Sequence, residues 1–168
     1  RDALRITEIM YHPDGNPDAE FIELQNIGWS SLALGDLRLA GGVAYDFAEA
    51  GLGQLPAGGR LVIAKNPELI RATPGARQAT VLGPWSGKLS NNGEAIRLET
   101  HWGETVFSVA YKGSWHRRTD GQGLSLVLRD VRSAPAEWSA KTGWTPGLFP
   151  GGSPGRGENE LAPLEPPL

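Results

Sequence analysis

Glu20-Phe-Ile-Glu-Leu-Gln-Asn-Ile-Gly28 is the densest β-forming run of the chain, and it ends in a turn signal. Phe21, Ile22 and Leu24 place apolar side chains on both faces of an extended strand, because successive side chains point to opposite faces. A strand that is apolar on both faces is buried on both sides of its sheet. Gly28 and the asparagine two residues before it favour turn conformations. The sequence therefore predicts a central strand that ends near Gly28.

The stretch before this strand, Ala3–Tyr11, changes its apolar phase midway. Leu4 and Ile6 share one face of an extended chain, whereas Ile9 and Tyr11 share the other. A β-bulge or burial on both faces explains such a change. We therefore expect a strand here, followed by a Pro- and Gly-containing loop that leads into the central strand.

Further short apolar runs are separated by turns and predict more strands. Asn66-Pro67-Glu68 has the residues of a helix start, and Pro74-Gly75 limits that helix to about two turns. About nine short strands with one short helix are typical of an all-β, antiparallel β-sandwich. The runs concerned are Leu32–Leu39, Val43–Phe47, Arg60–Lys65, Thr80–Leu89, Ile96–Leu98, Val106–Tyr111 and Leu124–Leu128.

The chain has 168 residues, a length that fits a single domain. We expect the sandwich to occupy residues 1–140. Residues 141–168 are rich in glycine and proline and have no periodic apolar face, which predicts an extended or disordered tail or linker unless a neighbour binds it. Because the first residue is Arg1 and no signal peptide is recognisable, we expect an excised part of a longer protein.

Charge and composition disfavour several classes of function. The chain has 16 basic and 19 acidic residues, a net charge of −3, and no basic run longer than His116-Arg117-Arg118. This balance does not favour binding to nucleic acid or to an anionic membrane. No apolar run approaches the ~20 residues of a membrane-spanning helix. Without cysteine there are no disulfides or thiolate metal sites, and this absence does not indicate the cellular compartment of the protein.

Seven blocks together resemble the bacterial lamin tail domain family, in the same order, over residues 3 to 155. The four residues Leu34–Leu37 depart from the family pattern, which often has a tryptophan there, and this difference concerns core packing. The matching blocks are Ile6–Pro13, Glu20–Gly28, Leu55–Lys65, Leu89–Leu98, Gly121–Leu126, Ala136–Ser139 and Gly151–Gly155.

The resemblance implies an immunoglobulin-like sandwich that acts as a non-catalytic binding or structural module. In bacteria such modules usually belong to larger secreted or surface proteins, so the resemblance implies an extracellular or cell-surface location. It also implies protein partners, either other domains of the same chain or cell-surface proteins. The family supplies no catalytic residues and no cofactor, and a fold alone assigns no site.

Asp14, Asn16, Asp18 and Glu20 alternate along the loop before the central strand. A curled loop with this spacing can direct four oxygen ligands at one Ca²⁺, which prefers oxygen. The loop is not an EF-hand, because Gly15 is not at the required sixth position and no helices flank it. The same residues are also common in solvated turns. We retain a calcium site as a hypothesis.

Trp29, Trp102 and Trp115 lie in or beside expected turns. Exposed indole rings can stack on sugars or anchor a protein partner, so a carbohydrate-binding module is an alternative function. Burial of these rings at the ends of the sandwich is the other interpretation. A nucleic-acid-binding module, suggested by eukaryotic relatives, would need a basic face that the charge balance does not favour.

The sequence gives no support for catalysis, and we expect a protein that is not an enzyme. His12, His101 and His116 are too far apart in sequence for a metal-binding motif, and no Gly-x-Ser-x-Gly elbow occurs. Glu20 and Glu23 point to opposite faces of their strand, so they cannot act as an acid–base pair. A hydrolase remains as an alternative that would require a clustered acid, base or metal pocket.

Overall fold

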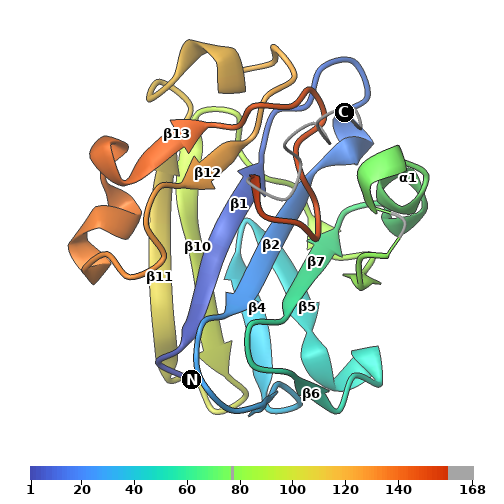
Figure 1. The fold of residues 1–168 in the computed structure, drawn as a ribbon, viewed down its shortest axis with the longest axis vertical. Helices are drawn as coiled ribbons and strands as arrows, with labels where there is room; N and C mark the ends of the chain where they lie inside the picture. Colours follow the sequence, from blue (N-terminus) through green and yellow to red (C-terminus); the bar gives the residue numbers. More distant parts are fainter. Residues whose placement is uncertain (77, 159–168) are drawn as a thin grey trace, which may run out of the picture.

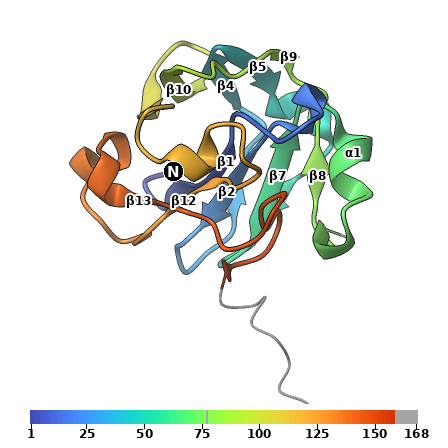
Figure 2. The same cartoon turned by 90° about the horizontal axis from the view of Figure 1, so that it is seen from above.

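The structure is a computed structural model that describes residues 1–76 and 78–158. Two β-sheets face each other and form a sandwich (Figures 1 and 2). The six-stranded sheet has the order β13 (Trp144–Pro146), β12 (Leu126–Leu128), β1 (Leu4–Met10), β2 (Phe21–Asn26), β7 (Arg60–Ala64) and β8 (Val81–Leu82). The five-stranded sheet has the order β11 (Thr105–Lys112), β10 (Gly93–Thr100), β4 (Leu37–Gly41), β5 (Val43–Asp46) and β9 (Ser86–Gly87).

Short elements complete the fold. All strand pairs are antiparallel except β7 with β8. A two-stranded sheet joins β3 (Leu32–Ala33) to β6 (Gln54–Leu55). The α-helix is α1 (Pro67–Arg71), and the 3-10 turns are η1 (Pro17–Ala19), η2 (Phe47–Ala50), η3 (Pro74–Ala76), η4 (Arg117–Thr119), η5 (Pro135–Ser139) and η6 (Lys141–Gly143).

The all-β sandwich predicted from the sequence is confirmed. The described residues contain thirteen strands instead of about nine. The difference comes from very short strands such as β3, β6, β8 and β9, which have two residues each. Two residues are too few for a period-2 pattern to appear in the sequence.

β2 is the central strand that the sequence predicts. It pairs with β1 on one side and with β7 on the other. Ile22 and Leu24 face the main core between the two sheets, whereas Phe21 belongs to a second cluster with Met10, Val62 and Ile70 on the outer face. The burial of β2 on both faces is therefore confirmed.

β1 contains the irregularity that its phase change predicts. Its register with β2 shifts between Ile6 and Glu8. Before the shift Leu4 and Ile6 face the main core, and after it Ile9 again faces that core while Met10 joins the outer cluster. The bulge lets Ile6 and Ile9 face the same core although they are three residues apart, a spacing that would place them on opposite faces of a regular strand.

The predicted helix is also confirmed. Asn66 caps α1, because its side chain accepts a hydrogen bond from the Glu68 N–H at 3.2 Å, and Pro67 opens the helix. The apolar runs Ile96–Leu98 and Val106–Tyr111 belong to β10 and β11, which form a hairpin with Trp102 in its turn. None of the helices within residues 1–76 and 78–158 has the length and apolar character of a membrane span.

The expected boundary at residue 140 needs correction, because the six-stranded sheet continues beyond it. β13 pairs with β12 through residues 144–146, and Trp144 is fully buried. The segment after β13, residues 147–158, lies across the outer face of the six-stranded sheet (Figures 1 and 2). Because this segment is held by polar contacts rather than by an apolar face, its sequence resembles that of a free tail. The rest of the expected tail, residues 159–168, lies outside the described residues.

Replacing Trp144 tests whether residues beyond 140 belong to the sandwich. We expect Trp144→Ala to lower the free energy of unfolding by about 3–5 kcal/mol, because a fully buried ring is lost. Its indole N–H also donates to the Trp138 carbonyl at 2.8 Å. Leu148→Ala is the control, because Leu148 is 72% exposed and its loss should change stability by less than about 0.5 kcal/mol. Urea unfolding measures both variants, and a wild-type midpoint for Trp144→Ala would contradict the assignment.

Candidate functional site

The loop proposed for calcium lies between β1 and β2 and folds into η1. Asn16 caps this turn, since its Oδ1 accepts a hydrogen bond from the Asp18 N–H at 2.9 Å. Asp18 Oδ1 lies 3.1 Å from Lys65 Nζ. Asp14 is exposed to solvent. Asn16 and Asp18 are therefore already engaged by other groups.

Glu20, the fourth proposed ligand, points away from the loop. It is buried, and its Oε2 accepts a hydrogen bond from the Leu89 N–H at 2.9 Å. Burial raises the pKa of Glu20, and the bond from Leu89 opposes that rise. The structure thus does not bring the four oxygens together, and no cluster of three or more metal-binding His, Asp or Glu side chains occurs in the described part of the chain.

The three proposed tryptophans occupy two environments. Trp29 is 94% exposed and Trp102 is 66% exposed, whereas Trp115 is only 8% exposed and belongs to the main core. The interpretation of Trp115 as a ligand-stacking ring is therefore wrong. Trp115 follows β11, and the turn formed by its N–H bond to the Lys112 carbonyl at 3.2 Å carries the ring into the core.

Trp29 and Trp102 lie at the same end of the sandwich, which we call the tryptophan end and define as loops 27–31 and 101–104 (Figure 1). The start of the chain lies between the two loops. Ala3 accepts a hydrogen bond from the Ile27 N–H at 2.9 Å, and the guanidinium carbon of Arg1 lies 5.6 Å from the Trp102 ring centroid. The loops that carry the two exposed rings thus lie on either side of the start of the chain, and the Arg1 cation lies over the Trp102 ring.

The three histidines lie apart from one another. His12 Nδ1 is 2.7 Å from Asp120 Oδ1, and His101 Nε2 is 2.9 Å from Asp46 Oδ1. His116 Nε2 is 3.1 Å from the Trp144 carbonyl oxygen. Each ring has a different partner, so the structure does not bring the histidines together.

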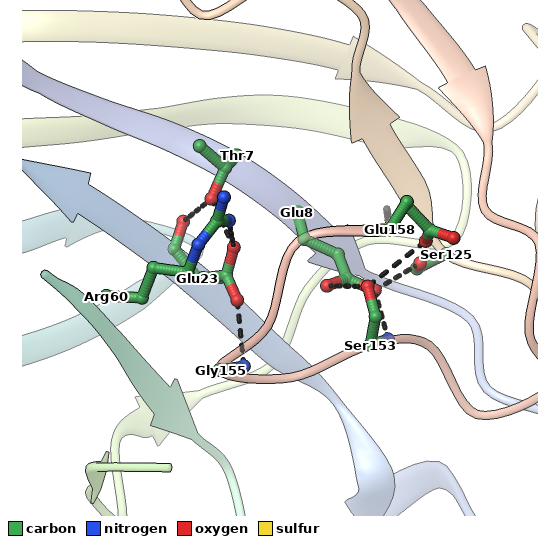
Figure 3. A network of polar contacts seen from close by, with 8 residues as sticks. All are labelled: Thr7, Glu8, Glu23, Arg60, Ser125, Ser153, Gly155 and Glu158. Atoms are coloured by element: carbon green, nitrogen blue, oxygen red, sulfur yellow. Dashed lines mark hydrogen bonds and ion pairs between the residues drawn. The ribbon is translucent and has the colours of Figure 1, made fainter. Parts of the chain in front are cut away.

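A site that sequence reasoning missed lies on the outer face of the six-stranded sheet. Glu8 of β1 is directly opposite Glu23 of β2, and both side chains are buried. We call them the carboxyl pair. Residues 147–158, here called the strap, cover them (Figure 3). Two facing carboxylates repel each other, so their position requires compensating contacts.

Glu8 is bound by two serines. Its Oε1 accepts hydrogen bonds from the Ser125 hydroxyl at 2.6 Å and from the Ser153 N–H at 2.8 Å. Its Oε2 lies 3.0 Å from the Ser153 hydroxyl oxygen, which is also 3.1 Å from Glu158 Oε1 (Figure 3). Glu8 therefore joins β12, through Ser125, to the strap.

Glu23 has a cationic partner. Its Oε1 accepts hydrogen bonds from Arg60 Nη1 at 2.7 Å and from the Thr7 hydroxyl at 2.5 Å. Its Oε2 accepts the Gly155 N–H of the strap at 2.8 Å (Figure 3). Burial raises the pKa of Glu23, and the Arg60 guanidinium opposes that rise.

The contacts of Ser153 require a proton on one of the two acids beside it, Glu8 or Glu158. A serine hydroxyl has one hydrogen, yet the Ser153 oxygen lies within bonding distance of Glu8 Oε2 and of Glu158 Oε1. Both contacts are satisfied when protonated Glu8 donates to Ser153 and Ser153 donates to Glu158. In agreement, burial, with the nearby Glu23 carboxylate, raises the pKa of Glu8 to about 8.

This arrangement is suited to holding the strap. All four oxygens of the carboxyl pair contact protein groups, and three of them contact strap residues. A cavity of about 550 Å³ lies beside the pair and is lined partly by Arg129 and Arg156. The sequence could not reveal the pair, because the bulge in β1 sets the register that places Glu8 opposite Glu23.

Replacing Glu8 with glutamine tests its protonation. A carboxyl with a raised folded-state pKa stabilises the fold most below its ordinary value of 4.5, and that stability is lost as pH rises through about 8. We expect the wild type to lose stability between pH 5 and pH 9 and Glu8→Gln to lose much less, since the neutral amide mimics the protonated acid. Melting temperatures across this range measure the difference. Equal pH dependence in both proteins would contradict a protonated Glu8.

Calcium titration tests the loop before β2. Because Asp18 contacts Lys65 and Glu20 contacts Leu89, we expect calorimetry with millimolar Ca²⁺ to give no binding heat and no gain in melting temperature. A gain that Asp14→Asn removes would show instead that the loop rearranges to bind the ion.

The family comparison agrees with the fold. The model of the Lamin Tail Domain family matches residues 1–113, which include all strands from β1 to β11. No curated protein matches the chain. β12, β13 and the strap lie beyond the matched residues and complete the six-stranded sheet and its outer face. Since the match covers more than half of the 168 residues, the chain belongs to the lamin tail domain family.

Proposed function

We propose that this domain is a non-catalytic binding module whose tryptophan end contacts a protein partner. The observation that carries the proposal is the exposure of two large rings, Trp29 and Trp102, whose loops lie at one end of the sandwich. A partner that covered both rings would remove roughly 150–250 Å² of surface per ring from water. Tryptophan is among the residues that contribute most to protein interfaces.

The surroundings of Trp102 favour a protein partner. Arg1 lies over the ring and also forms an ion pair with Asp36, so the indole is held next to a polar group. An aromatic centre with a charged rim is typical of protein interfaces. Partners of this kind include other domains of the parent chain and cell-surface proteins.

The wider setting of the domain is part of the same proposal. Bacterial lamin tail domains usually belong to larger secreted or surface proteins, which supports an extracellular or surface role here. A non-catalytic role is supported by the carboxyl pair, whose oxygens contact strap, Ser125, Thr7 and Arg60. The net charge of −3 disfavours nucleic acid as the partner.

A glycan is the second candidate ligand. Trp29 is 94% exposed, and a free indole face can stack on a sugar ring. A glycan array distinguishes the two ligands, because a protein-binding surface gives no glycan-dependent signal.

A double replacement at the tryptophan end tests the proposed function. We expect Trp29→Ala with Trp102→Ala to reduce capture of partner proteins from secreted and surface fractions at least about tenfold, as loss of interface anchors does. Leu148→Ala is the matched control, since it removes an exposed apolar side chain from the strap instead. Quantitative mass spectrometry compares the captured proteins. Equal capture by the double variant and the control would contradict the proposal.

A further inference from the structure

A second surface with binding features lies on the flank of the sandwich. A cavity of about 340 Å³ opens between the start of β1, strand β11 and the segment that contains η5. We call it the side groove. Its apolar walls include Leu4, Phe107 and Trp138. The volume is within the lower range of sites that bind small ligands or single side chains of a partner.

The side groove runs along a free strand edge. β11 is the edge strand of the five-stranded sheet, and η5 packs beside it (Figure 1). The outward N–H of Ala110 is already used, because it donates to the Ser139 hydroxyl at 2.9 Å. Backbone groups of an edge strand alternate between its partner and the outside. The N–H and C=O of Ser108, two residues earlier, therefore also point outward.

Ser108 offers these groups to a new strand. Its side chain is exposed and lines the side groove. Within residues 1–76 and 78–158, no hydrogen bond engages its outward backbone groups. Unpaired edge groups are the usual site at which an extended peptide adds to a sheet.

Two buried polar groups of the side groove also have no partner. The Trp138 indole N–H and the Ser133 hydroxyl make no hydrogen bond within the described residues. Trp138 is only 9% exposed, so water does not readily supply the hydrogen bond that its indole N–H lacks. An indole N–H can only donate. The missing partner is therefore an acceptor, such as a carbonyl or carboxylate oxygen.

The charge around the side groove also favours an acceptor that is negative. Arg1 and Arg5 line it together with one acid, Asp2, and because Arg1 is paired with Asp36, Arg5 supplies the positive charge that can meet a ligand. The guanidinium carbon of Arg5 lies 4.5 Å from the Trp138 ring centroid. Arg5 is held there by bonds to the carbonyl oxygens of Val131 at 2.9 Å and Asp2 at 2.6 Å.

From these observations we infer that the side groove binds an extended peptide segment of a partner protein by strand addition to β11. The peptide backbone pairs with Ser108. Because strand side chains alternate, an apolar residue enters the cavity beside the packed rings of Phe107 and Trp138. A neighbouring Asp or Glu of the peptide lies near Arg5, and a carbonyl or carboxylate oxygen accepts the Trp138 N–H.

This inference goes beyond the proposed function and does not depend on it. The tryptophan end consists of loops 27–31 and 101–104 at one end of the sandwich, whereas the side groove is lined by the start of β1, by β11 and by the segment that contains η5. A protein could therefore occupy the tryptophan end while a peptide occupied the groove. The two ideas fail separately, because Trp29 and Trp102 do not line the groove and the tryptophan end does not include Ser108 or Trp138.

The test starts from a phage-displayed library of random linear heptapeptides selected on the immobilised domain. We expect enriched sequences with an apolar residue next to Asp or Glu. A selected peptide is then titrated into ¹⁵N-labelled domain and followed by NMR. The Ser108 amide and the Trp138 indole N–H should show the largest shifts. Absence of enrichment, or shifts confined to other surfaces, would overturn the inference.

Three variants of the domain locate the peptide. Trp138→Phe keeps an aromatic ring but removes the N–H donor, and we expect about tenfold weaker binding. Trp85→Phe is the matched control, because its indole N–H is also buried without a partner in the described residues but lies outside the groove, and affinity should not change. Ser108→Pro removes the outward N–H, which β10 does not use, and should abolish strand addition. Equal affinity of all three variants and the wild type would refute the site.

Further measurements exclude the other occupants. If 4-methylpentanoate bound as tightly as the selected peptide, the groove would be a site for small carboxylates and strand addition would be wrong. If light scattering showed a dimer that Ser108→Pro dissociates, a second copy would be the occupant instead. Trp29→Ala with Trp102→Ala should leave peptide affinity unchanged, which separates this test from that of the tryptophan end.

Discussion

Burial of β2 on both faces requires a cover on each side of the six-stranded sheet. The five-stranded sheet supplies the inner cover, where Ile22 and Leu24 join the main core. On the outer face, Phe21 packs in a cluster with Ile70 of α1, and the strap covers Glu23. The helix and the strap are therefore consequences of a strand that cannot leave either face in water.

The outer cover consists of two physically different parts. Around Phe21 it is apolar and needs no specific geometry beyond close packing. Around Glu8 and Glu23 it is polar, and it forms only if each buried oxygen finds a donor. Ser153 and Gly155 supply such donors from the strap, while Arg60 balances the charge of Glu23. Hydrogen bonds to the two buried carboxyl groups, rather than hydrophobic contacts, thus link the strap to the sheet.

The sequence predicted those features that depend on local pattern. The two-sided burial of Glu20–Gly28, the bulge before Glu8 and the helix start at Asn66 each follow from a few adjacent residues. It did not predict the carboxyl pair, because that pair depends on the register between two strands. Nor did it place the strap or β13, since glycine and proline are typical both of free tails and of segments held by backbone hydrogen bonds. The burial of Trp115 was not predicted either, because the sequence does not show whether a residue in a turn points outward or packs into the core.

The structure predicts that Glu8 stays protonated under the strap at neutral pH, and its side-chain carboxyl carbon reports this state directly. In protein labelled with ¹³C at glutamate carboxyl groups, the resonance of Glu8, assigned through Glu8→Gln, can be followed from pH 3 to pH 9. We expect the chemical shift of a neutral acid at pH 7 and a titration centred at about 8. A titration near the ordinary value of 4.5 would contradict it.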